Sequence, residues 1–224
     1  GASNNALGYA ALYANTTGSN NVAIGNSAME SNTTADANTA VGKSALYANT
    51  TGTANVAVGY QSLDANTTAS YNTAMGYASL GANTTGASNT AVGANSLLTA
   101  STATANTAVG SAALKLLTTG SSNTAVGCAA GDSITGGAQN TIVGMEALQA
   151  NTTGANNIAM GYQALYLNTA SENVGIGVYC LDANTTGGNL VGVGYNVLGA
   201  NTTGGQNTAV GHTALDANTT ASDN

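Results

Sequence analysis

The chain carries very little charge. It has 2 basic and 9 acidic residues among 224, which gives a formal net charge of −7. Binding of nucleic acid or of anionic membranes requires several cations that neutralise phosphates. We therefore expect no nucleic-acid partner and no membrane insertion.

Large apolar residues are also scarce. Proline, phenylalanine and tryptophan are absent, and the 43% of hydrophobic residues consists largely of alanine. Such a chain cannot fill an ordinary globular core of this size. Disorder is disfavoured, because the apolar residues recur in register and the mean hydropathy is slightly positive, +0.05. We therefore expect a thin core, one or two side chains wide.

Residues suited to chemistry are few. Cys128 and Cys180 lie three repeats apart, or roughly 14 Å at ~4.8 Å per strand, beyond the reach of a disulfide. We interpret both as packing or surface thiols. The only histidine, His212, lacks a partner that would orient it as a general base, and the acids are spread out rather than paired. We expect no catalytic residue, no metal site, no cofactor and no enzymatic activity.

The main feature of the chain is a repeat of seventeen residues. A glycine closes a short aliphatic run in every repeat, with one step of sixteen between Gly161 and Gly177. The unit reads N-T-A-V-G-Y-x-A-L-x-A-N-T-T-G-x-x, and each copy predicts two short strands and two turns. Stacked repeats of this kind form solenoids. We predict an all-β fold, a parallel β-solenoid (β-roll) of thirteen coils of seventeen residues that occupies residues 1–224 as a single array.

Two columns of apolar residues predict the core. One column directly precedes the glycine and the other follows it by four positions. We expect them to form opposite walls of the interior, so that Asp in place of Val109 would collapse the central coils. The predicted core includes Val41, Val58, Val92, Val109, Val126, Leu46, Leu63, Leu80, Leu97 and Leu114.

Asparagine recurs four positions before the glycine. It tolerates the left-handed conformation at a corner, and its amide can bond the same amide one coil away. This predicts an internal, structural corner ladder at Asn21, Asn38, Asn55, Asn72, Asn89, Asn106, Asn123 and Asn140.

The triplet Asn-Thr-Thr is the most regular polar feature. Each copy satisfies the N-glycosylation sequon, but glycans ~5 Å apart could not all be accommodated, which favours a turn role and leaves sparse glycosylation open. The first threonines would stack into an outward ladder, similar to the threonine arrays of ice-binding β-solenoids. Two adjacent threonines followed by glycine depart from the Thr-x-Thr order of those arrays. The candidate binding face is Thr16, Thr33, Thr50, Thr67, Thr84, Thr152, Thr185 and Thr202.

The repeat also resembles a known family. The runs at 38–42 (N-T-A-V-G) and 21–28 (N-V-A-I-G-N-S-A) are similar to the head repeats of YadA-like trimeric autotransporter adhesins. The longer pattern is similar to repeat arrays of bacteriophage tail-fibre and tail-spike proteins, and the resemblance covers the whole chain. It implies a left-handed parallel β-roll, three chains associated along their length, and a stiff shaft that binds host surfaces.

Two features depart from that family. Its head repeat is usually shorter than seventeen residues, and threonine stands at positions such as Thr39 and Thr73 where the head favours valine. Support for a trimer comes from a column of small residues that would let neighbouring backbones approach closely. That column is Ala6, Ala23, Ala40, Ala57, Ala74, Ala91, Ala108 and Ala125.

These observations predict a structural, non-enzymatic fibre or shaft subunit. We expect it to be extracellular, at a cell surface or on a virion, and to be one window or subunit of a longer fibre. Its main partner would be another copy of itself, through lateral trimerisation or head-to-tail stacking, with a host-surface receptor or glycan as a further partner. The alternative is an ice-binding solenoid that uses the threonine ladder.

Overall fold

The computed structural model describes residues 1–224. It is an all-β, parallel β-solenoid with coils of about 17 residues and no helix, as predicted, and it has thirteen strands. The chain divides into two compact units, Gly1–Ala112 and Ala113–Asn224, and both are built from the same coil. No helix is therefore present that could cross a membrane.

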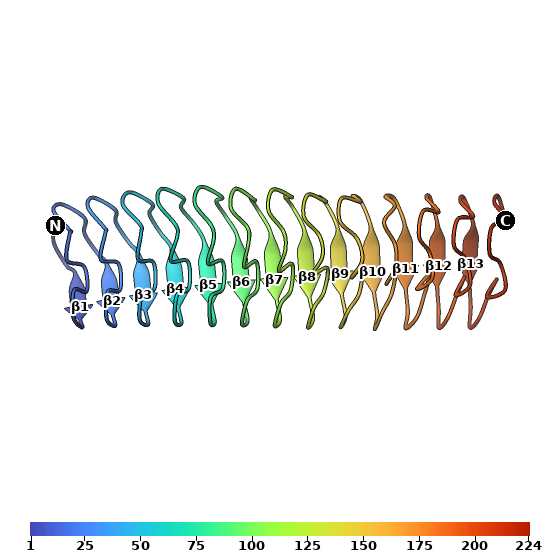
Figure 1. The fold of residues 1–224 in the computed structure, drawn as a ribbon, viewed down its shortest axis with the longest axis horizontal. Helices are drawn as coiled ribbons and strands as arrows, with labels where there is room; N and C mark the ends of the chain where they lie inside the picture. The colour runs from blue at the N-terminus through green and yellow to red at the C-terminus, as the bar shows by residue number, and fades with distance from the viewer. The chain divides into compact units, whose positions relative to one another are not determined.

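Within each unit the strands pair in parallel and in chain order (Figure 1). The register is one repeat per strand, so that Ala40 lies beside Ala57 in the first unit and Gly192 beside Ala209 in the second. The first unit contains Asn5–Leu7 (β1), Val22–Ile24 (β2), Thr39–Val41 (β3), Val56–Val58 (β4), Thr73–Met75 (β5), Thr90–Val92 (β6) and Thr107–Val109 (β7). The second contains Thr124–Val126 (β8), Thr141–Val143 (β9), Ile158–Met160 (β10), Val174–Ile176 (β11), Val191–Val193 (β12) and Thr208–Val210 (β13).

The single step of sixteen residues does not disturb the strands. Ile158 of β10 still pairs with Val174 of β11, sixteen positions later. The missing residue is therefore absorbed in the turns between these strands. The strand register is more strongly constrained than the turn length.

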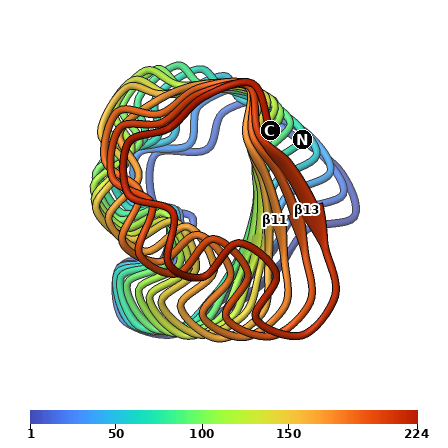
Figure 2. The same ribbon diagram turned by 90° about the vertical axis from the view of Figure 1, so that its right-hand side faces the viewer.

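Each coil has one strand, where two were predicted. The segment with the recurring leucine is not a strand, because Ser44 and Leu46 have φ values of 56° and 53°, in the left-handed region. Its backbone still bonds the next coil: the amide of Leu46 donates to the carbonyl of Ser62 at 3.0 Å, and that of Ala48 to Asp64 at 2.9 Å. In Figure 2, viewed along the stack, β11 and β13 lie on the same side of the coil in the second unit.

The leucine column lines the core. Leu46, Leu63, Leu80, Leu97 and Leu114 are all completely buried. The opposite wall consists of the middle residue of each strand, which is alanine in most coils and Ile142, Gly175 or Gly192 in β9, β11 and β12, and this column is buried from β2 to β13. It comprises Ala23, Ala40, Ala57, Ala74, Ala91 and Ala108 in the first unit.

The column before the glycine points outward, so its predicted place in the core is wrong. Val109 and Val126 are 37% and 39% exposed, and Val41, Val58 and Val92 are partly exposed. Side chains of the facing segment limit the space behind the strand: a Cβ added at Gly192, in the alanine column, would lie 2.7 Å from Cys180 Sγ and 3.2 Å from Leu181 Cδ1. A larger residue of this column, Ile142, is buried where Gly131 replaces the facing leucine. Because strand side chains alternate, alanine inside forces valine outside.

The same geometry corrects a second expectation. The alanine column faces the interior rather than a neighbouring chain, so it does not let two backbones approach. The close approach occurs instead between coils, at the glycine that ends each strand. Gly42 has a φ of 135°, and a Cβ there would lie 2.4 Å from the carbonyl oxygen of Gly59. Any side chain at this position would separate adjacent coils.

Candidate functional site on the outward strand face

The first and third residues of each strand form the outward strand face. From β2 to β13 every one of these residues is Thr, Val, Ile or Met, and none is charged. β3 contributes Thr39 and Val41, and β10 contributes Ile158 and Met160. Several of these side chains are well exposed, including Ile24 (40%) and Met75 (44%). Each unit thus presents a regular, uncharged row of β-branched and thioether side chains to solvent.

The column that follows the leucine is far more variable, whereas the exposed second threonines of the Asn-Thr-Thr turns, such as Thr51 and Thr85, form another uniform column. The residue that follows the leucine can be Tyr47, Asp64, Lys115, Gln149 or Gly199. Solvent tolerates such variety because little depends on an individual surface side chain. The outward strand face is exposed and yet as restricted as a core column. Contiguous exposed apolar surface of this kind marks an interaction site. We therefore identify it as the candidate binding surface.

The first threonines of the Asn-Thr-Thr triplets, predicted as an outward binding ladder, use their hydroxyl groups within the fold. Its hydroxyls donate hydrogen bonds to the carbonyl of the threonine one coil on, as from Thr33 to Thr50 at 3.1 Å and from Thr50 to Thr67 at 3.0 Å. The same bond runs from Thr185 to Thr202 at 2.9 Å in the second unit. These hydroxyl groups therefore donate their protons to hydrogen bonds between adjacent coils. The neighbouring residues Thr34, Thr51, Thr68 and Thr85 are exposed, whereas Thr33, Thr50, Thr67 and Thr84 of the ladder are partly buried.

The corner ladder lies where the repeat places it. All eight predicted asparagines, from Asn21 to Asn140, are buried. The side-chain oxygen of Asn38 accepts the backbone amide of Asn55 at 2.9 Å, while the amide of Asn38 donates to the carbonyl of Gly52 at 2.9 Å. The ladder therefore runs mainly through side chain and backbone, and amide-to-amide contacts are secondary. Leu190 interrupts it and still donates its backbone N–H to Asn173.

A second asparagine ladder was not predicted. It consists of the asparagines of the Asn-Thr-Thr triplets, which are buried from Asn32 to Asn83 and from Asn151 to Asn201. The amide of Asn66 donates to the side-chain oxygen of Asn49 at 2.9 Å and to the carbonyl of Ala69 at 3.0 Å. The nitrogen that N-glycosylation would modify is thus enclosed and bonded in the folded coil. The sequence signal was Ala100, Leu117 and Ile134, apolar residues in the same column.

The isolated reactive groups do not converge. Burial raises the pKa of the Cys180 thiol to about 11, so it stays protonated and unreactive at neutral pH. Cys128 is exposed, and His212 is exposed and stacked on Tyr195 with ring centroids 5.2 Å apart. No group of three or more His, Cys, Asp or Glu side chains is placed to hold a metal ion.

Comparisons with protein-family models, curated proteins and solved structures found no match. The site is therefore described by its own geometry alone. That geometry consists of buried asparagine and leucine columns, which organise each coil, and of two uniform exposed features, the outward strand face and the column of second threonines.

Proposed function

We propose that the chain is a structural segment of an extracellular fibre, in which copies associate side by side through the outward strand face. The observation that carries the proposal is the restricted, uncharged composition of this exposed face from β2 to β13. Its partner is a second and a third copy of the same chain. The proposal assigns no catalytic role. The extracellular location is supported by the resemblance of the repeat to adhesin heads and phage fibres.

Sheet faces of this type can pack on one another. Two sheets pack face to face about 10 Å apart when their side chains interdigitate. β-branched side chains on a regular lattice suit such packing, because their rotamers are already restricted and little side-chain entropy is lost. The threonines among them can form hydroxyl bonds across the interface.

The area of the face explains why many coils are needed. The seven three-residue strands of the first unit cover roughly 300 Å², from ~4.8 Å between strands and ~3.3 Å per residue. A stable protein interface buries about 800 Å² on each partner. A few coils are therefore insufficient, and a long array can associate firmly because its weak contacts act together. This matches a shaft better than a compact binding module.

The proposal is tested by placing lysines on the face. Val58→Lys with Val92→Lys adds two charges that an isolated coil can solvate but a dry interface cannot. We expect the parent to sediment as an oligomer and this variant as a monomer with an unchanged circular dichroism spectrum. The matched control is Thr51→Lys with Thr85→Lys, which adds the same charge at exposed corners and should remain oligomeric. A monomeric parent at high protein concentration, or equal effects of both variants, would refute the proposal.

Ice binding is a second candidate function. Its proposed binding surface is now the outward strand face instead of the first threonines of the Asn-Thr-Thr triplets. The strands place threonine and valine side by side on the outside, as at Thr90 and Val92, whereas the first threonine of the Asn-Thr-Thr triplet, such as Thr84, donates its hydroxyl to the neighbouring coil. A monomeric parent that shows thermal hysteresis, lost in the Val58→Lys, Val92→Lys variant, would support ice binding. Replacing Thr50, Thr67 and Thr84 by Tyr should then have a smaller effect. An oligomeric parent without hysteresis would support the fibre.

A further inference from the structure

A row of aromatic rings runs along one turn of the second unit. It consists of Tyr162, Tyr179, Tyr195 and His212, one from each of four successive coils. The ring centroids are 5.4 Å apart from Tyr162 to Tyr179, 6.1 Å from Tyr179 to Tyr195, and 5.2 Å from Tyr195 to His212. The first two contacts are edge-to-face and the third is stacked. We call this row the aromatic strip.

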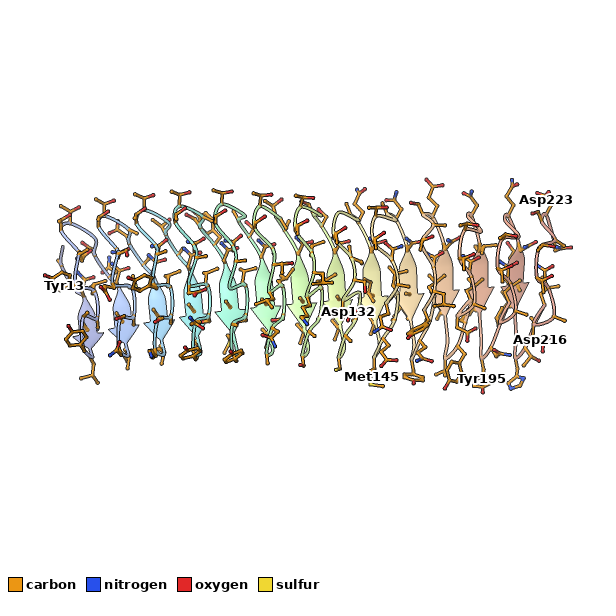
Figure 3. The ribbon with its side chains drawn as sticks, in the orientation of Figure 1. Tyr13, Asp132, Met145, Tyr195, Asp216 and Asp223 are labelled. Atoms are coloured by element: carbon orange, nitrogen blue, oxygen red, sulfur yellow. The ribbon has the colours of Figure 1, made fainter.

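The strip is open to solvent and has apolar neighbours. Tyr195 is 48% exposed and His212 is exposed, while Tyr162 and Tyr179 are partly exposed. Met145 (46%) belongs to the same turn one coil before Tyr162. Figure 3 shows Met145 and Tyr195 projecting from the same edge of the second unit, opposite Asp223. The strip is thus a continuous apolar ridge rather than a set of isolated rings.

Polar groups in fixed positions flank the ridge. Gln163 Nε2 donates to Glu146 Oε2 at 2.7 Å, which orients both side chains beside Tyr162. Desolvation raises the pKa of Tyr162, and Tyr179 and Glu146 raise it further. A tyrosine phenol is neutral at pH 7 even without this shift and can donate a hydrogen bond. The strip therefore combines flat apolar faces with oriented hydrogen-bonding groups. No lysine or arginine belongs to it, and the chain has a net charge of −7.

We propose that the aromatic strip binds a neutral, linear saccharide. The absence of cations in the strip disfavours phosphate, sulfate or nucleic-acid ligands, which need them. A pyranose ring has one flat face of C–H groups and an edge of hydroxyls. It therefore suits an aromatic face flanked by hydrogen-bonding side chains, because Tyr is apolar on its faces and polar at its tip. Rings in successive coils would contact successive sugars. The strip lies on the turn that follows each strand rather than on the outward strand face, and the proposal does not depend on lateral assembly.

The test is affinity electrophoresis of the full chain in native gels containing dextran, mannan, xylan, galactan or mixed-linkage β-glucan. We expect retardation in at least one gel. The double variant Tyr179→Ala, Tyr195→Ala should weaken that retardation at least tenfold, because two adjacent stacking surfaces are removed. The control Tyr13→Ala, Tyr71→Ala removes two exposed tyrosines outside the strip and should be retarded like the parent. Tyr195→Phe should keep most of the binding.

Several results would overturn the inference. They are the absence of retardation in every gel, equal loss in the control variant, or binding only to polylysine or to heparin run as charged probes. Circular dichroism and sedimentation of each variant separate this outcome from failure of the fibre proposal. If Tyr179→Ala, Tyr195→Ala loses binding but keeps the parent's oligomeric state, the strip acts independently of the strand face. A parent that is monomeric yet binds saccharide would refute only the fibre.

Discussion

Asparagine is the residue that organises this protein. Most coils bury two of them, one in the corner ladder and one in the Asn-Thr-Thr ladder, with no charge nearby to compensate. Burying an amide without partners costs about 1–3 kcal/mol. Here most of the cost is avoided, because each amide bonds its own turn and the adjacent coil. Asn therefore fixes both the corner geometry and the register between coils.

The ends of the second ladder show how this works. The side-chain oxygen of Asn83 has no hydrogen-bond partner, because Ala100 replaces the asparagine that would donate to it from the next coil. The oxygen of Asn151 is also unpartnered, and Asn168, in the same column of the next coil, donates to Ala170 O at 3.0 Å. Each oxygen depends on one donor in the following coil. A buried interruption therefore leaves a polar atom unsatisfied.

Replacing Asn66 by Ala should lower the free energy of unfolding by about 2–3 kcal/mol. The change removes the donor to Asn49 and to Ala69, and the acceptor of the Asn83 amide at 2.9 Å. Urea unfolding followed by circular dichroism measures the shift. The control Asn26→Ala, at an exposed turn position, should change stability by less than about 0.5 kcal/mol. Equal effects of both variants would mean that the ladder bonds contribute little.

At the scale of the strand, the alternation of side chains does not decide which residues face the core, and residue size predicts the wrong ones. The sequence N-T-A-V-G alternates, so either alanine or the pair of threonine and valine must face inward. Size favours valine inside, and this was the prediction. The structure places alanine inside, because buried leucines such as Leu46 and Leu63 already fill the narrow interior. A shift of one residue changes the face of every side chain in the strand.

The turns follow from sequence only in part. Glycine and asparagine marked where the chain bends, and the glycine spacing gave the coil length and the strand register. The sequence did not show that ordinary residues adopt left-handed conformations in every coil, as Ser44, Leu46 and Ala54 do. Hydrogen bonds to adjacent coils impose these conformations. They are long-range contacts that no local preference in a single repeat reveals.

One such turn offers a test. Ala105 is exposed and has a φ of 56°. Glycine there would relieve about 1–2 kcal/mol of left-handed strain and would cost about 0.5–1 kcal/mol in backbone entropy. Ala105→Gly should therefore stabilise the protein by about 0.5–1 kcal/mol in urea unfolding.

The matched control has the opposite expected sign. Ala82 is also exposed and also donates its backbone amide to the adjacent coil, at 3.0 Å from Leu98 O, but its φ is not positive. Ala82→Gly should lose about 0.5–1 kcal/mol, since only the entropy cost remains. Destabilisation by both substitutions would show that Ala105 is not strained.

Over the whole chain, stability rests on hydrogen bonds and small-residue packing rather than on charge. The repeat length, the all-β class and the leucine wall could be predicted because each depends on a pattern that recurs in nearly every repeat. The binding surfaces could not. The outward strand face looked like a core column, and the aromatic strip is confined to four coils of the second unit, where Tyr179 departs from the consensus position. Features that occur in a few coils are invisible to an argument from the repeat.

The acidic composition predicts an unusual pH dependence. Desolvation raises the pKa of both Asp64 and Asp182 in the folded chain, and one carboxyl oxygen of Asp182 is buried without a hydrogen-bond partner. A raised pKa means that the folded state binds the proton more tightly than the unfolded state. Stability is then gained as pH falls through the folded pKa, and the gain is complete below the unfolded value near 3.9. Falling net charge acts in the same direction.

The melting temperature should therefore rise between pH 7 and about pH 4, where many proteins lose stability because their paired carboxylates are protonated. Scanning calorimetry of the parent at several pH values measures this. Asp64→Asn with Asp182→Asn should be more stable than the parent at pH 7 and should show a flatter pH profile, because the charge that burial penalises is gone. Asp223→Asn removes one exposed carboxylate and tests the contribution of net charge alone. A melting temperature that falls on acidification would mean that other carboxylates are held in their charged form by the fold, and that these two aspartates do not control its stability.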